Sequence, residues 1–333
     1  MISKVVNSFF QMSPPRWMSG TLITIAVLLF CAAQFSINAV NGWWMDELYS
    51  LWASDTSIPF RVAFSERIYP DTNPPTYYSL LYLARLVEGD DRATILLLNF
   101  FFLAAAVGSV IFVSRKARMP ELAAIGISLF ILSGPVLVYA AEARVYLAAL
   151  AVAFVTAWYV ALAIDEPDSQ PSLGVFIGLG ALGALTHVYA ALFCGCLAAG
   201  LLALAIWDPR RRDLLGPALA LGLSTTVIFV IWLLSIRAAL DRADWLEFTS
   251  KTLMTAFWYV KVVTVGPRLL LLFMAVLLSA GLLYKRTRPL VIVFGIAFGL
   301  FVLLPVVISL KKPILAGRYW MIGAPGLIVV LAR

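Results

Sequence analysis

Charged residues are scarce in this chain. Asp, Glu, Lys and Arg make up 13% of its 333 residues, whereas hydrophobic residues make up 62%. A soluble globular domain has about 25% charged residues, so this composition excludes that class. It predicts a polytopic membrane protein, and the length leaves room for about nine or ten membrane-spanning helices.

Cysteine and histidine are also scarce. Cys31, Cys194 and Cys196 all lie in apolar segments, and His187 is the single histidine. The cysteines are therefore expected to be small core residues, and neither a disulfide framework nor a zinc site is indicated. A histidine in an apolar segment is more often a hydrogen-bonded packing residue than a ligand, but contact with substrate or metal stays open for His187.

The motifs of common soluble enzymes are missing. The sequence has no Walker loop, no Gly-rich dinucleotide fingerprint, no His-Glu-x-x-His pair and no Gly-x-Ser-x-Gly elbow. Most basic residues behind the net charge of +7 lie in short loops between apolar runs, so the charge indicates topology and not a nucleic-acid partner. Chemistry is therefore expected at a membrane face, on a lipid-borne substrate.

Long apolar runs are what the sequence has in abundance, and most can cross a bilayer as a helix. The expected spans are 20–40, 93–113, 122–141, 145–164, two short spans within 173–207 that meet near His187, 214–236, one that ends at Tyr284, 290–310, and a stub from Tyr319. We therefore expect an all-α transmembrane helical bundle that forms a single domain over residues 1–333. Short spans such as those at His187 indicate a binding cavity.

Basic clusters define one side of this bundle. They are Arg115/Lys116/Arg118, Arg210/Arg211/Arg212 and Lys285/Arg286/Arg288, together with Lys4 and Arg16 before the first span. The positive-inside rule makes that side cytoplasmic, so the N-terminus is expected to be a cytoplasmic, uncleaved signal anchor in a bacterial inner membrane. The periplasmic side then receives residues 41–92, the turn at 142–144, His187, residues 237–268 and residues 311–318.

The first outer loop, about residues 41–92, is far longer than a connector needs to be. Asp46 and Glu47 are the first ionisable groups after the first span, and four aromatic residues that favour the headgroup level flank them. Such an acidic pair can be merely solvated, or it can carry chemistry. Residues 73–87 are apolar but too short to span, so they are expected to form an interfacial helix that starts at a proline.

Two further groups of charges lie on the outer side. Lys311, Lys312 and Arg318 break the positive-inside rule, and they either snorkel from helix ends or clamp a lipid phosphate. Glu142 and Arg144 form either a local ion pair or a carboxylate and guanidinium aimed into the same cavity as Asp46.

Five short motifs occur in a characteristic order. They are Trp44-Met45-Asp46-Glu47, Asn73-Pro74-Pro75-x-Tyr77-Tyr78, Glu142-Ala143-Arg144-Val145-Tyr146, Thr186-His187-Val188-Tyr189, and Gly317-Arg318-Tyr319 followed by Pro325. The ordered set resembles the GT-C glycosyltransferases, in particular the bacterial branch of protein O-mannosyltransferases and the aminoarabinose transferase of lipid A. Many members carry further spans or an outer soluble domain, so we expect a minimal member or one truncated after Arg333.

The resemblance implies transfer of a sugar from a polyprenyl-phosphate donor to an acceptor hydroxyl of a glycan, lipid or protein at the periplasmic face, with inversion. Asp46 is the expected general base, and Glu47 orients it or a sugar hydroxyl. The expected ligands of the donor phosphate are Lys311, Lys312, Arg318, Tyr319 and Arg144. The residues expected to line the substrate cavity are Asp71, Asn73, Tyr77, Glu142 and His187. No cofactor is required, although Asp46 and Glu142 are the pair that would hold a divalent metal, and the partners include membrane lipids but no nucleic acid.

A lipid or sugar flippase or transporter is the alternative of a different class. It would predict charges buried in the middle of spans and a repeat between the halves. The spans are nearly free of charge, and no such repeat is found. A structural membrane subunit would leave the outer cluster of acidic and basic residues unexplained.

The topology is testable by cysteine labelling with an impermeant reagent. In intact spheroplasts we expect cysteines placed at Asp46, Glu142 and Arg318 to react, and those at Arg211 and Arg286 to react only after lysis. Labelling at position 211 but not at position 46 would overturn the scheme.

Overall fold

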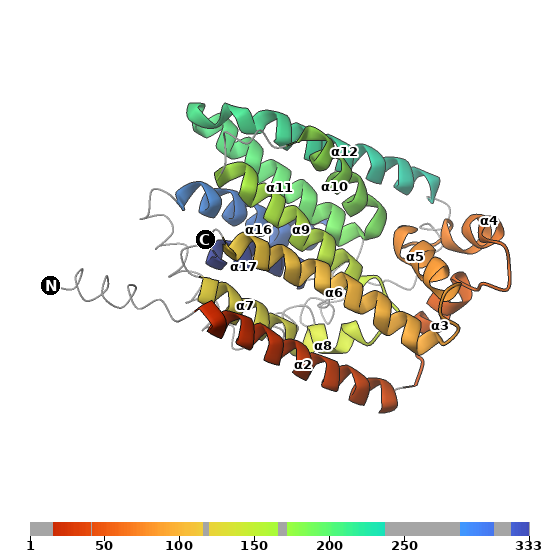
Figure 1. The fold of residues 1–333 in the computed structure, drawn as a ribbon. Helices are drawn as coiled ribbons and strands as arrows, with labels where there is room; N and C mark the ends of the chain where they lie inside the picture. Colours follow the sequence, from red (N-terminus) through yellow and green to blue (C-terminus); the bar gives the residue numbers. More distant parts are fainter. Residues whose placement is uncertain are drawn as a thin grey trace.

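Helices make up all the regular secondary structure in the described part of the chain. The computed structural model describes residues 16–40, 42–115, 120–165, 172–236, 287–309 and 321–332, and no strand occurs among them. Figure 1 shows the long helices side by side in a bundle. The expected all-α fold is thus confirmed for these residues.

Six of these helices are long and apolar enough to cross a membrane. They are α2 (Arg16–Val40), α6 (Asp91–Arg115), α9 (Tyr146–Asp165), α11 (Val188–Trp207), α12 (Leu215–Ser235) and α16 (Arg288–Ser309). Each overlaps most of one of the runs from which a span was predicted, and α11, with 20 residues, is longer than the short span expected there. The helix α10 (Leu173–Thr186) has only 14 residues, and it is separated from α11 at His187 as expected. A last helix, α17 (Ala324–Ala332), follows.

The span expected over residues 122–141 is divided in two. It forms α7 (Pro120–Ile131) and α8 (Gly134–Ala140), separated by Ser133 in an extended conformation. Pro135 in the first turn of α8 has no N–H, so an uninterrupted helix would lose a hydrogen bond and meet the proline ring. The buried Gln34 side chain of α2 donates a 2.7 Å hydrogen bond to the carbonyl of Leu137 and so ties α8 to the first helix.

Several expected features lie outside the described residues. They are the amphipathic segment before Arg268, the span that ends at Tyr284 and the basic loop at 311–318. The number of spans in the whole chain therefore stays a prediction.

Small residues allow two pairs of helices to approach closely. A Cβ atom at Gly180 of α10 would lie 2.7 Å from the carbonyl oxygen of Leu221 in α12. A Cβ atom at Gly200 of α11 would lie 2.5 Å from the carbonyl oxygen of Val293 in α16. Close approach at small residues is a main source of helix–helix attraction where lipid replaces water.

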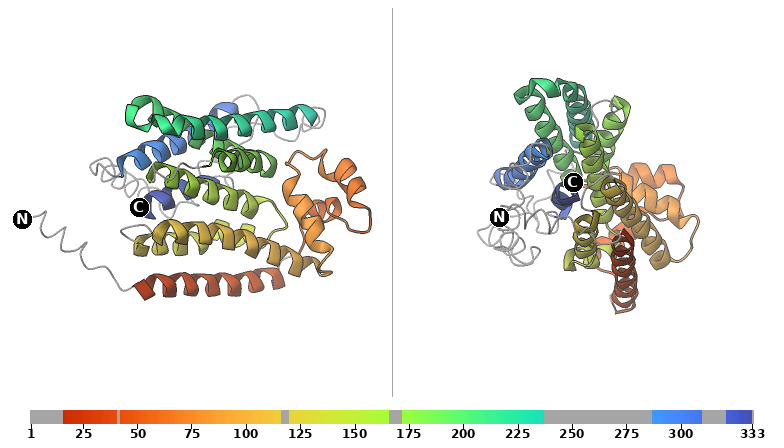
Figure 2. Two further views of the ribbon diagram at one scale, coloured as in Figure 1. Left: turned by 45° about the horizontal axis from the view of Figure 1, so that its top comes forward. Right: turned by 60° about the vertical axis from the view of Figure 1, so that its left-hand side comes forward.

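Four short helical segments form a separate layer at one end of the bundle. They are α3 (Met45–Ala53), α4 (Phe60–Ala63), the π-helix η1 (Phe64–Ile68) and α5 (Thr76–Arg85). Figure 2 shows in both views that this layer, which we call the end layer, projects beyond the long helices. The helix expected over residues 73–87 is present as α5, and its location at a membrane interface stays a prediction.

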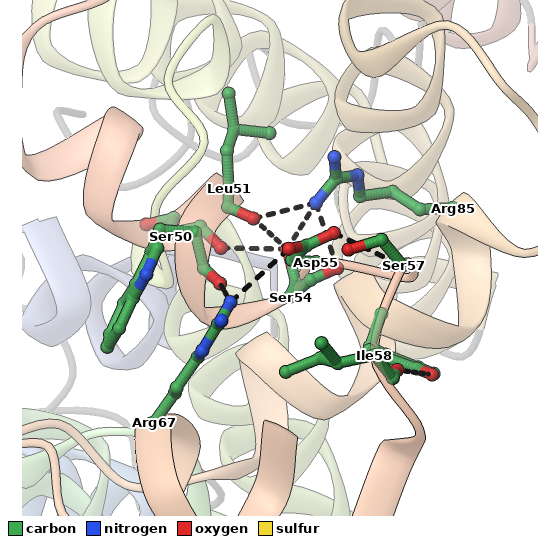
Figure 3. Close-up of polar contacts among 10 residues, drawn as sticks. Ser50, Leu51, Ser54, Asp55, Ser57, Ile58, Arg67 and Arg85 are labelled. Atoms are coloured by element: carbon green, nitrogen blue, oxygen red, sulfur yellow. Dashed lines mark hydrogen bonds and ion pairs between the residues drawn. The ribbon is translucent and has the colours of Figure 1, made fainter. Parts of the chain in front are cut away.

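Two arginines hold the end layer together (Figure 3). Arg85 donates to the carbonyl oxygens of Leu51 and Ser54 at 2.7 and 2.8 Å, where they end α3, and its Nε pairs with Asp91 at 2.8 Å. Carbonyls at a helix C-terminus have no partner within the helix, so the guanidinium satisfies them and their dipole together. Arg67 joins α3 in the same way, through a 2.7 Å hydrogen bond to the carbonyl of Trp52.

The basic loop before α12 lies at the other end of the bundle. Arg211 donates a 2.7 Å hydrogen bond to the carbonyl of Ile164, in the last turn of α9. The first residue of α9, Tyr146, follows the turn that contacts the end layer, and a 20-residue helix is about 30 Å long. This separation agrees with the expected topology, although which end faces the periplasm stays a prediction.

The close approach at Gly180 predicts a stability difference between two neighbouring glycines of α10. We expect Gly180→Ala to lower the free energy of unfolding by about 1–3 kcal/mol, because the added methyl group meets backbone of α12. Gly178→Ala is the matched control, since a Cβ there has nothing within 4 Å. Thermal unfolding in detergent measures both, and an equal midpoint for the two variants would contradict this packing.

Candidate active site

An ion pair joins the first outer loop to the turn before α9. Arg144 Nη2 lies 3.2 Å from Oδ2 of Asp46, and Nη1 lies 3.4 Å from the backbone carbonyl of the same residue. Arg144 is 8% exposed, whereas the side chain of Asp46 is 38% exposed. Oδ1 of Asp46 has no hydrogen-bond partner among the described residues. The guanidinium of Arg144 therefore binds one carboxylate oxygen of Asp46, Oδ2, and not the other, Oδ1.

The N-terminus of α3 stabilises the two carboxylates of Asp46 and Glu47. Asp46 and Glu47 lie in the first turn of α3, where the partial positive charge of a helix N-terminus stabilises carboxylates. Successive residues of a helix point about 100° apart. Asp46 therefore keeps solvent contact, while Glu47 is buried at 5% exposure.

Glu47 uses both oxygens to bind backbone. Its Oε2 accepts from the N–H of Trp44 at 3.2 Å, and its Oε1 accepts from the N–H of Ala143 at 3.0 Å. The first contact caps α3, and the second fixes the turn that carries Arg144. Glu47 thus binds backbone on both sides of the contact between α3 and this turn, and its role in orienting Asp46 stays a prediction.

The turn between α8 and α9 is held from a second side by α6. The buried side chain of Asn99 donates to the carbonyls of Ala140 and Glu142 at 2.6 and 3.1 Å. The N–H of Arg144 donates to the carbonyl of Glu142 at 2.8 Å. Sequence reasoning missed Asn99, because one asparagine in an apolar span looks like an ordinary polar packing residue.

A second polar group adjoins the ion pair on the α5 side. Nη1 of Arg144 lies 3.5 Å from the hydroxyl of Tyr78, which also accepts from Asn73 Nδ2 at 3.4 Å. Asn73 donates as well to Oδ2 of Asp71 at 3.2 Å. Burial raises the pKa of Tyr78, and the Asp71 charge raises it further, so this phenol is neutral at physiological pH. Asp71 and Asn73, both expected cavity residues, thus lie one side chain away from Arg144.

Tyr77, Glu142 and His187 lie around this centre in different ways. Tyr77 is fully buried, and its hydroxyl has no hydrogen-bond partner among the described residues. Burial raises its pKa, and its electrostatic neighbours include Arg144, Glu47 and Glu142. His187 is buried, caps α11 by accepting from the N–H of Tyr189 at 3.1 Å, and its ring contacts that of Tyr146 with centroids 6.2 Å apart.

Negative charge dominates the described part of the site. Asp46, Glu47, Asp71 and Glu142 surround the single guanidinium of Arg144. No group of three or more His, Cys, Asp or Glu that could hold a metal ion occurs among the described residues. The other expected phosphate ligands, Lys311, Lys312, Arg318 and Tyr319, lie outside the described residues.

The two backbone contacts of Glu47 predict a loss of stability when one oxygen is replaced. We expect Glu47→Gln to lower the free energy of unfolding by about 1–3 kcal/mol, since an amide NH₂ cannot accept from a buried N–H. Glu66→Gln, on the exposed side of η1, is the matched control. Thermal unfolding in detergent checks the prediction, and equal midpoints would show that Glu47 does not fasten the turn.

Comparisons with known proteins give a likeness in fold. No protein-family model matches the chain, and no curated protein matches its sequence. Among solved structures it is similar to the crystal structure of ArnT from Cupriavidus metallidurans bound to undecaprenyl phosphate, with a TM-score of 0.60 and 16% sequence identity. The match covers 93% of this chain and 59% of ArnT, so this chain spans less than two thirds of that protein's length. The likeness shows that this chain shares the fold of ArnT over most of its length.

Proposed function

We propose that this chain is a membrane glycosyltransferase that moves a sugar from a polyprenyl-phosphate donor to an acceptor hydroxyl at the periplasmic face. The observation that carries the proposal is the half-exposed carboxylate of Asp46, which Arg144 holds by one oxygen only. The likeness in fold to ArnT, whose crystal structure contains undecaprenyl phosphate, supports a donor of this chemical class.

The reaction needs a base but no strong acid. The acceptor oxygen attacks the anomeric carbon from the face opposite the phosphate, and its proton passes to Asp46. The bond between the anomeric carbon and the phosphate oxygen breaks, and its electron pair leaves with the polyprenyl phosphate. Attack from the opposite face inverts the anomeric centre. Because the leaving phosphate is a weak base, nearby cations suffice to stabilise it.

The remaining residues take roles that follow from their positions. Glu47 orients Asp46 through the first turn of α3 and the turn at Ala143. Asp71, Asn73 and Glu142 are partly exposed polar groups suited to bind sugar hydroxyls, whereas the buried Tyr77 and His187 would support the substrate site from behind.

The donor phosphate requires more positive charge than Arg144 supplies. Four carboxylates lie around this one guanidinium, so an incoming phosphate would meet net negative charge. We therefore assign the phosphate mainly to Lys311, Lys312 and Arg318 with Tyr319, and we give Arg144 a share from its place beside Asp46. A divalent metal held by Asp46 and Glu142 would serve the same electrostatic purpose, and a chelator distinguishes the two arrangements.

The proposed base is tested by Asp46→Asn. The amide is nearly isosteric with the carboxylate but cannot take a proton, so single-turnover transfer should fall by about 10²–10⁴-fold while donor binding persists. The measurement incubates membranes with radiolabelled polyprenyl-phosphate sugars of several types, with and without chelator, and follows label into periplasmic glycans.

Asp213→Asn is the matched control, because Asp213 is exposed and lies in the basic loop at the far end of the bundle. Near-normal transfer by Asp46→Asn would refute the proposed base. Loss of donor binding together with sensitivity to chelator would instead assign Asp46 to a metal.

A further inference from the structure

The guanidinium of Arg144 lies between two carboxylates. One, Asp46, contacts it directly at 3.2 Å. The other, Asp71, is linked to it through Asn73, which also donates to the Tyr78 hydroxyl, 3.5 Å from Nη1 of Arg144. An arginine has several rotatable bonds, and both of its contacts with Asp46, at 3.2 Å to the carboxylate and 3.4 Å to the backbone carbonyl, are to a single half-exposed residue. The Tyr78 contact comes from a different helix and so fixes the guanidinium from a second side.

The Tyr78 hydroxyl is well placed to be a fixed anchor. Tyr78 is 2% exposed, and its ring packs against Tyr49 at 6.0 Å and Tyr77 at 5.9 Å. The hydroxyl accepts from Arg144 at 3.5 Å and from Asn73 at 3.4 Å, and Asn73 also donates to Asp71 at 3.2 Å. Both acceptor positions of the phenol oxygen are thus used. Connected hydrogen bonds polarise one another, which strengthens a contact that is long by itself.

We propose that Tyr78 is a positioning residue for the base. Its hydroxyl, anchored by Asn73 and through it by Asp71, keeps Arg144 against Oδ2 of Asp46 and so aims Oδ1 at the acceptor hydroxyl. This role rests on the proposed glycosyltransferase function and adds to it a residue that never touches substrate. Asp71 thereby acts on the base through Tyr78 and Arg144 in addition to its contact with sugar.

The neighbouring tyrosine separates this role from simple packing. Tyr77 lies on the same helix, is equally buried, and has a hydroxyl without a hydrogen-bond partner among the described residues. The ring alone therefore fills space at both positions, and what distinguishes Tyr78 is the hydroxyl. Removing only that oxygen is the direct test.

The test is Tyr78→Phe, measured as kcat and KM in the transfer assay with purified full-length chain. We expect kcat to fall by about 10- to 100-fold, since a misplacement of the base by about 1 Å has a cost of this size. The donor KM should change by less than about threefold, because the donor phosphate is assigned mainly to Lys311, Lys312 and Arg318 and only in part to Arg144. Tyr159→Phe is the matched control: it also loses one hydroxyl contact, to the N–H of Ser172, but about 20 Å along α9 from Tyr146.

A double-mutant cycle with Arg144→Lys provides the second readout. If Tyr78 acts through the arginine, Tyr78→Phe should lower kcat by about twofold or less once the forked guanidinium is gone. Effects that multiply in the double variant would overturn the proposal, as would a wild-type kcat in Tyr78→Phe. Should Tyr78→Phe prove unstable in thermal unfolding, Asp71→Asn tests the same connection from its exposed end and should lower kcat in the same direction; an unchanged kcat there would also overturn it.

The outcome distinguishes the two levels of proposal. If the wild-type chain transfers sugar and the Tyr78→Phe variant does so equally well, only the positioning role is refuted. Absence of transfer by the wild-type chain with every donor refutes the proposed function and the positioning role together.

Discussion

The contact between the start of α3 and the turn before α9 is the constraint on which the site depends. Arg144 meets Asp46, 98 positions away along the chain, and Ala143 meets Glu47 beside it. Neither half of the site is complete without the other. Arg144 is buried, so separation of the two halves would leave its charge without the carboxylate that compensates it, and this cost favours the contact.

This contact also explains why the buried charged side chains of the described residues lie at one end of the bundle. Among the described residues, the only buried charged side chains are Glu47 and Arg144, and both belong to the same small region at the end layer. A charge at the centre of a bilayer is costly, and transporters accept that cost at the substrate pathway. The described spans of this chain avoid that cost, because their buried charges lie at the end layer.

The interruption between α7 and α8 is what brings the arginine to its place. A single straight helix over residues 122–141 would have no break at Ser133, and the hydrogen bond from Gln34 to Leu137 would have no reason to form where it does. The short α8 instead ends in a turn to which Asn99 and Glu47 form hydrogen bonds from two sides. The end layer is stiffened separately by Arg67 and Arg85, so that α3 and α5 present Asp46 and Tyr78 to the same guanidinium.

The sequence by itself determined the helical class and the break at His187. It also marked Asp46, Glu47, Asp71, Asn73 and Arg144 as candidate site residues, because apolar runs and isolated polar residues are visible without a fold. Only the tertiary structure decided the partners. It paired Arg144 with Asp46 on a distant helix, turned Glu47 toward backbone, and brought in Tyr78 and Asn99, which carry no charge to mark them. Pairing across about a hundred residues depends on how helices pack, and side-chain spacing along one chain does not encode it. The division of the span at Ser133 was missed for a related reason: hydropathy measures length in lipid, whereas a helix ends where a proline and a polar neighbour make another conformation more stable.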